Sequence, residues 1–135
     1  MATEFTVLIE DRPGALADLT ETLARNGINI TAIHATPGPG GGVVQMLTNN
    51  SDATVNALRE ASVKYTVREV VLVNLLDQPG SLARLTRALG DAGINITGVY
   101  ITMRGQIVLS ADDLARAQRI ALEATSEHGA PRTGE

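Results

Sequence analysis

Apolar and polar positions alternate at the start of the chain and then recur at helical spacing. Thr3–Glu10 has the two-residue period of a half-buried strand. A helix with an inward stripe of leucines is expected next, formed by Leu16, Leu19 and Leu23. Asn26-Gly27 supplies residue types that commonly end a helix, and a second strand is expected from Ile28 to about Thr36. The pattern therefore opens with a strand, a helix and a strand.

Glycine and proline separate this second strand from a returning one. Thr36–Gly42 breaks both periods and is expected to form only a turn, so that Val43–Thr48 returns as a hairpin partner. A second helix is then expected, capped by Ser51 or Asp52, and a further strand begins near Tyr65. This order of elements is typical of a ferredoxin-like sandwich, an antiparallel sheet with two helices on one face.

The same plan is written again 66 residues later (77 minus 11). Asp11–Thr31 reads DRPGALADLTETLARNGINIT, and Asp77–Thr97 reads DQPGSLARLTRALGDAGINIT. No turn separates Tyr65 from Leu76, so the last strand of the first copy is expected to continue directly into the second copy. The elements expected in the second copy are strands at Glu69–Leu76, Ile94–Met103 and Gln106–Ser110, with helices at Pro79–Asp91 and Asp112–Thr125.

The fold class expected is therefore α+β, with two ferredoxin-like βαββαβ units in tandem. We expect the first unit at residues 1–68, the second at residues 69–127 and a polar tail at residues 128–135. Because the tail is short and contains Gly and Pro, the second unit is expected to lack its last strand. A strand without its neighbour leaves an edge that proteins usually cover, which favours a homodimer.

Composition and charge narrow the function. The chain of 135 residues has no cysteine, which excludes disulfides, thiolate nucleophiles and the common zinc motifs. A formal net charge of -4 without a basic run argues against nucleic acid as a partner, and no apolar run approaches the roughly 20 residues of a membrane span. No signal peptide is recognised, so a cytoplasmic location is expected. Two histidines without a paired acid and base predict no catalytic site, metal site or cofactor, and therefore no enzyme.

Each copy carries an Asp-x-Pro-Gly turn between its first strand and its first helix: Asp11, Pro13 and Gly14, then Asp77, Pro79 and Gly80. In a purely structural interpretation, Asp caps the helix and Pro occupies its first turn. The free N–H groups at a helix N-terminus also suit a carboxylate, and an Asp at the rim suits an ammonium group. A zwitterion would satisfy both groups.

A Gly-Ile-Asn-Ile motif follows each of these helices and contains Asn29 or Asn95. Strand alternation directs the isoleucines to the helix-covered face and the amide to the opposite face. The amide is then either a solvated structural side chain or a ligand contact. Its repetition at the same distance from the Asp-x-Pro-Gly turn favours a ligand contact.

The two motifs together resemble those of the ACT domain, a ferredoxin-like regulatory module found on many amino-acid biosynthetic enzymes. ACT domains associate side by side and typically bind a free amino acid between modules. The resemblance implies that Asp11 and Asp77 hold the amino group of the ligand and that backbone amides of the turns hold its carboxylate. It also implies that Asn29 and Asn95 contribute from an adjacent module. The implied ligand-binding residues are Asp11, Pro13, Gly14, Ala15, Leu16, Asn29, Asp77, Pro79, Gly80, Ser81, Leu82 and Asn95.

The sequence thus predicts a non-enzymatic cytoplasmic protein that binds a free amino acid at interfaces between ACT modules. The alternative is a protein-interaction subunit of an amino-acid biosynthetic enzyme or transcription regulator, with degenerate ligand sites. Melting experiments with free amino acids distinguish the two hypotheses, since only a binding protein is stabilised by its ligand.

Overall fold

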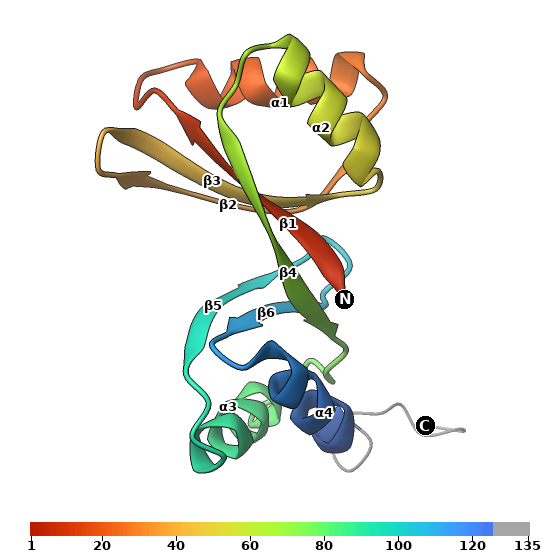
Figure 1. Ribbon diagram of the computed structural model, residues 1–135. Coiled ribbons are helices and arrows are strands. Elements are labelled where there is room, and N and C mark those ends of the chain that lie inside the picture. Colours follow the sequence, from red (N-terminus) through yellow and green to blue (C-terminus); the bar gives the residue numbers. More distant parts are fainter. Residues whose placement is uncertain (126–135) are drawn as a thin grey trace. The chain divides into compact units, whose positions relative to one another are not determined.

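Figure 1 shows the computed structural model of the chain, which describes residues 1–125. Within these residues the chain forms six strands and four helices. They divide into two compact units, residues 3–69 and residues from 70 onward together with residues 1–2. We call these the first and the second unit. The expected polar tail, residues 128–135, lies outside the described residues.

The first unit has the strand order β2-β3-β1-β4, with two helices on the same face of the sheet (Figure 1). β1 pairs antiparallel with β3, where Phe5 lies opposite Met46. This is the ferredoxin-like arrangement predicted from the sequence. The elements are β1 (Ala2–Ile9), α1 (Ala15–Arg25), β2 (Ile30–Gly38), β3 (Gly41–Thr48), α2 (Ser51–Glu60) and β4 (Tyr65–Val73).

The second unit repeats this arrangement with the strand order β4-β6-β5. Val71 at the end of β4 lies opposite Leu109 of β6 in an antiparallel pair. Up to residue 125 no strand follows the last helix, so the described part of this unit has three strands where the first unit has four. Its remaining elements are α3 (Ser81–Asp91), β5 (Ile96–Ile101), β6 (Ile107–Ala111) and α4 (Leu114–Ala124).

One strand, β4, carries the chain from the first unit into the second, which confirms the expected direct continuation. β4 nevertheless ends at Val73, whereas the sequence suggested a strand as far as Leu76. Its last pair joins Val73 to Ile107, the first residue of β6, so β4 has no partner in β6 beyond this position. The N–H of Gln78 donates to the carbonyl of Leu76 at 3.0 Å in the turn before α3.

Each unit has its own apolar core between its helices and its sheet. The first core consists of Phe5, Val7, Leu19, Leu23, Ile28, Val44, Met46, Ala57 and Leu58. The second consists of Val71, Val73, Leu85, Leu89, Ile94, Ile107, Leu109, Ala117 and Ala121. Burial of these side chains between the helices and the sheet of each unit supplies most of the favourable free energy of folding.

One leucine predicted to face the core does not. Leu16 is 39% exposed, so its assignment to the inward stripe was wrong, and Leu82 at the equivalent position of α3 is 43% exposed. Both lie at the second position of their helices, and the buried face of α1 instead runs through Ala15, Leu19 and Leu23. At about 100° per residue, Leu16 lies on the same side of α1 as Leu19 and Leu23, so its exposure comes from its position at the helix end and not from the phase of the helix.

The glycine-rich stretch is also more ordered than predicted. β2 continues to Gly38 and β3 begins at Gly41, so only Pro39-Gly40 remains between the strands. Pro37 is accommodated because β2 ends the strand order, and an edge strand tolerates a missing N–H donor. A Cβ atom on Gly41 would lie 2.5 Å from the carbonyl oxygen of Ile9, so glycine permits this close approach.

Candidate functional site

The two Asp-x-Pro-Gly segments form the same turn. The residues that precede the helices are Gly14, with φ 86° and ψ -13°, and Gly80, with φ 90° and ψ -14°. This left-handed conformation costs other residues roughly 1–2 kcal/mol. The turn therefore requires the glycine of each motif, and each helix starts immediately after it.

Asp11 and Asp77 do not cap these helices, which corrects the prediction. α1 and α3 have no side-chain cap, and both carboxylates belong to exposed residues. Pro13 and Pro79 lie before the helices and not in their first turns. The cause is the left-handed glycine, which reverses the chain between the aspartate and the helix. The aspartates are thereby left at the rim of the turn.

The absence of a side-chain cap leaves backbone donors available at the start of α1. The N–H of Ala15 donates to the carbonyl of Arg12 at 3.2 Å, and the first helical bond joins the N–H of Asp18 to Gly14 at 2.9 Å. Between these two, the N–H groups of Leu16 and Ala17 have no acceptor within the helix. They point out of the helix N-terminus, where an anion is favoured.

The start of α3 is built in the same way. The N–H of Ser81 donates to the carbonyl of Gln78 at 3.3 Å, and the N–H of Arg84 donates to Gly80 at 2.9 Å. The N–H groups without a helical acceptor are those of Leu82 and Ala83. Of the backbone amides implied as carboxylate donors, those of Ala15 and Ser81 are thus already bonded inside the turns.

A cavity of about 200 Å³ opens beside the first turn. This volume is sufficient for a small zwitterion. Asp11 and Arg12 provide charge at its rim, and Leu16 provides apolar surface. The whole lining consists of Ile9, Glu10, Asp11, Arg12, Ala15, Leu16, Ala35, Thr36, Pro37, Val43 and Val44.

Asn29 and Asn95 precede β2 and β5 and expose their side chains. Their main chains are fixed: the N–H of Asn29 donates to Oδ1 of Asn49 at 2.9 Å, and the N–H of Asn95 donates to Oδ1 of Asp112 at 3.1 Å. In the described part of the chain, neither side-chain amide has a hydrogen-bond partner. Both are therefore available to an external group.

The structure does not bring the amides to the turns within one unit. The first turn lies at the N-terminal end of α1, and Asn29 follows the C-terminal end of the same helix. An 11-residue helix separates the two positions by about 16 Å. The residues of each turn lie together because they are neighbours in the sequence, whereas the amide of the same unit is too far away to join them.

Sequence reasoning missed the charged side chains that surround the turns. Nη2 of Arg12 donates to Oδ2 of Asp18 at 3.0 Å, and Nε donates to Oε2 of Glu10 at 2.6 Å. The hydrogen bond with Asp18 and then that with Glu10 raise the pKa of Arg12 above its ordinary value. The sequence does contain a sign of these ion pairs, because Glu10, Arg12 and Asp18 around the first motif alternate in charge. The residues at the equivalent positions of the second motif are Leu76, Gln78 and Arg84.

Within residues 1–125, no three His, Asp or Glu side chains come together as metal ligands. No helix in that range is both long and apolar enough to cross a bilayer.

Comparison with known proteins identifies the fold. The model of the ACT domain matches residues 3–61 and 70–114, which include both turns and both asparagines. The chain belongs to the ACT-domain family. No protein with a curated description matches the sequence.

Several solved structures resemble nearly the whole chain. A protein from Bacteroides thetaiotaomicron has a TM-score of 0.80 at 22% identity, covering 93% of this chain and 87% of its own. The ligand-free regulatory subunit of aspartate kinase from Thermus thermophilus has a TM-score of 0.63 at 21% identity, covering 91% of both chains. The corresponding subunit from Thermus flavus has a TM-score of 0.65 at 20% identity, covering 93% of this chain and 90% of its own. At these identities the likeness establishes the fold.

The capping geometry gives a first prediction. Oδ1 of Asn50 accepts the N–H of Ala53 at 3.0 Å and caps α2, whereas Asp11 caps nothing. Asn50→Ala should therefore lower the free energy of unfolding by about 0.5–2 kcal/mol, and Asp11→Ala should change it by less than about 0.5 kcal/mol. Urea denaturation of both variants checks this, and a loss for Asp11→Ala as large as that for Asn50→Ala would contradict the observed cap.

Proposed function

We propose that this protein is a non-enzymatic regulatory protein that binds a free amino acid at its Asp-x-Pro-Gly turns. The observation that carries the proposal is the uncapped helix N-terminus beside an exposed aspartate, which occurs in both units. The free N–H groups match the carboxylate of a zwitterion, and Asp11 or Asp77 matches its ammonium group. The same ligand is thus complementary to both halves of the turn.

Asn29 and Asn95 complete this site from a neighbouring module. Their amides carry both donor and acceptor groups, are exposed and have no partner within residues 1–125. Because they lie a helix length from the turn of their own unit, they serve a turn that belongs to another module. A ligand held in this way lies at an interface between modules and stabilises their association.

A regulatory role fits the fold. Two of the structurally similar proteins are regulatory subunits of aspartate kinase. We propose by analogy that this protein acts in the cytoplasm on a biosynthetic enzyme and transmits to it the level of a free amino acid.

The interaction-subunit alternative has one specific observation in its favour. At the first turn the guanidinium of Arg12 is held by two carboxylates of the chain itself, Glu10 and Asp18. A turn whose charges are already paired does not need a ligand for its integrity. In this alternative both turns are structural, and the exposed residues of the units bind a protein partner.

An amino-acid screen separates the two functions. A ligand that binds only the folded state stabilises it by RT ln(1 + [L]/Kd), which is about 2.7 kcal/mol at a hundredfold excess over Kd. We expect one or a few of the twenty amino acids to raise the melting temperature, and Asp77→Ala, Asn29→Ala or Asn95→Ala to diminish that rise. Asn56→Ala, at an exposed position of α2, is the matched control and should behave like the parent. If none of the twenty amino acids raises the melting temperature, the interaction-subunit function replaces the proposed one.

We further propose a homodimer, because the described part of the second unit has three strands where the first unit has four. Sedimentation equilibrium at micromolar concentration should give twice the chain mass of 14.2 kDa. A single species at the mass of one chain under these conditions would contradict it.

A further inference from the structure

A guanidinium group lies against the glycine of each turn, but the two come from different positions. A Cβ atom on Gly14 would lie 3.6 Å from Nη1 of Arg12, and a Cβ atom on Gly80 would lie 3.1 Å from Nη1 of Arg84. Arg12 precedes its helix, whereas Arg84 belongs to the first turn of α3. Each helix N-terminus therefore has a cation beside it.

In the first turn the chain neutralises this cation itself. Glu10 lies 2.6 Å and Asp18 lies 3.0 Å from nitrogens of the Arg12 guanidinium. Asp18 also places a negative charge in the first turn of α1, where it opposes the positive end of the helix dipole. With Asp11 included, the first turn carries three carboxylates and one guanidinium.

In the second turn, Asp77 is the one acidic residue of the motif, and no described carboxylate pairs with Arg84. The residues equivalent to Glu10 and Arg12 are Leu76 and Gln78, and α3 has no acidic residue in its first turn. Within residues 1–125, Arg84 makes no ion pair, and its Nε is buried without a hydrogen-bond partner. Its hydrogen bond among the described residues is a long contact of 3.5 Å from Nη2 to Oγ of Ser81.

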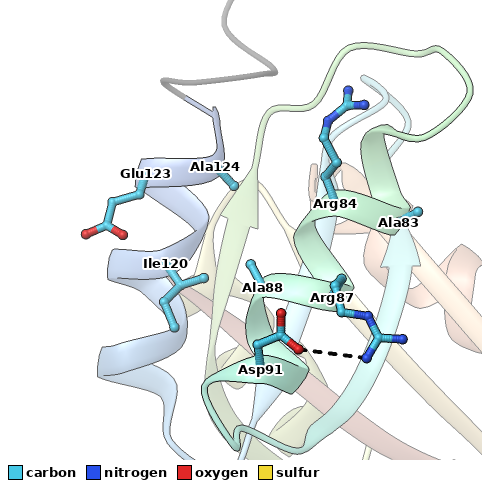
Figure 2. Close-up of a pocket in the computed structure, with 8 residues that line it drawn as sticks. All are labelled: Ala83, Arg84, Arg87, Ala88, Asp91, Ile120, Glu123 and Ala124. Atoms are coloured by element: carbon cyan, nitrogen blue, oxygen red, sulfur yellow. Dashed lines mark ion pairs between the residues drawn. The ribbon is translucent and has the colours of Figure 1, made fainter.

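The neighbouring ion pair of Arg87 and Asp91 does not neutralise the charge of Arg84. Nη1 of Arg87 lies 3.9 Å from Oδ1 of Asp91, and Figure 2 shows Arg84 extending away from that pair. A cation at the positive end of a helix is unfavourable, and a buried donor without an acceptor costs free energy. An anion bound at the N–H groups of Leu82 and Ala83 relieves the first cost, because it accepts bonds from the backbone and lies beside the guanidinium, whose Nη1 is next to Gly80.

We propose that the two turns are not equivalent, that the second turn accepts the carboxylate, and that Arg84 is the residue that selects it. In the first turn, the carboxylates that surround Arg12 neutralise its charge and repel anions. The proposal rests on the proposed function for the identity of the ligand, the carboxylate of a free amino acid. Its consequence is one strong anion site in each chain instead of two.

Acetate is a suitable probe because it has the carboxylate without the ammonium group. The full chain is titrated with sodium acetate and followed by ¹⁵N–¹H correlation spectra, with the ionic strength kept constant by sodium chloride. We expect the amide signals of Leu82 and Ala83 to shift until they reach saturation. Those of Leu16 and Ala17 should change much less. Arg84→Gln should weaken acetate binding at the second turn about tenfold or more, the loss typical of a hydrogen bond to a charged group. Arg87→Gln is the control on the same helix and should leave it unchanged.

Exchanging the charged residues of the first turn for those of the second tests whether these residues determine anion binding. The triple variant Glu10→Leu, Arg12→Gln, Asp18→Arg gives the first turn the residues of the second, and its Leu16 and Ala17 amides should then respond to acetate. Equal responses of the two turns in the parent, no response at either, or a response at the second turn that survives Arg84→Gln would each overturn the proposal. An acetate response at the second turn without a response to any amino acid supports the proposal while removing the proposed function.

Discussion

The left-handed glycine that precedes α1 and α3 is the constraint on which the candidate site depends. Gly14 and Gly80 reverse the chain after the strand, so the helix starts directly behind them and no side chain reaches its first N–H groups. A residue with a Cβ atom would strain this conformation. One backbone angle thus sets the position of the aspartate, the start of the helix and the exposure of its donors.

The internal repeat separates what the backbone requires from what the side chains add. Both turns have nearly the same φ and ψ at the glycine and the same pattern of main-chain hydrogen bonds. Their charges differ, because Arg12 is enclosed by Glu10 and Asp18 while Arg84 has no such partners within residues 1–125. The same scaffold therefore presents one turn whose charges are satisfied internally and one whose charge favours a bound anion.

The order of elements, the ferredoxin-like units and the continuous strand β4 were predictable from periodicity, because apolar spacing reports directly on burial. Periodicity did not predict that Leu16 and Leu82 are exposed, since the spacing does not show that both lie at the end of a helix. It also did not predict that Pro37 lies in a strand, because pairing at a sheet edge is decided by tertiary contacts.

The candidate site was predictable to the same degree. The turn residues are contiguous, so the motif identified them as a group, although the role of Asp11 as a cap was wrong because propensity takes no account of the glycine conformation. The position of Arg84 beside Gly80 depends on the direction of a side chain one helical turn away, which the sequence does not state. Asn29 and the turn of its own unit lie at opposite ends of α1. Their separation could be predicted only once the length of this helix was known.

Amide hydrogen exchange at the starts of α1 and α3 measures most directly whether these helix N-termini bind a carboxylate. Without ligand, the uncapped N–H groups of Leu82 and Ala83 should exchange rapidly, because no acceptor in the helix protects them. With a saturating amount of an amino acid that raises the melting temperature, their exchange should slow. Exchange at these amides that is the same with and without that amino acid would contradict a carboxylate site at the helix N-terminus.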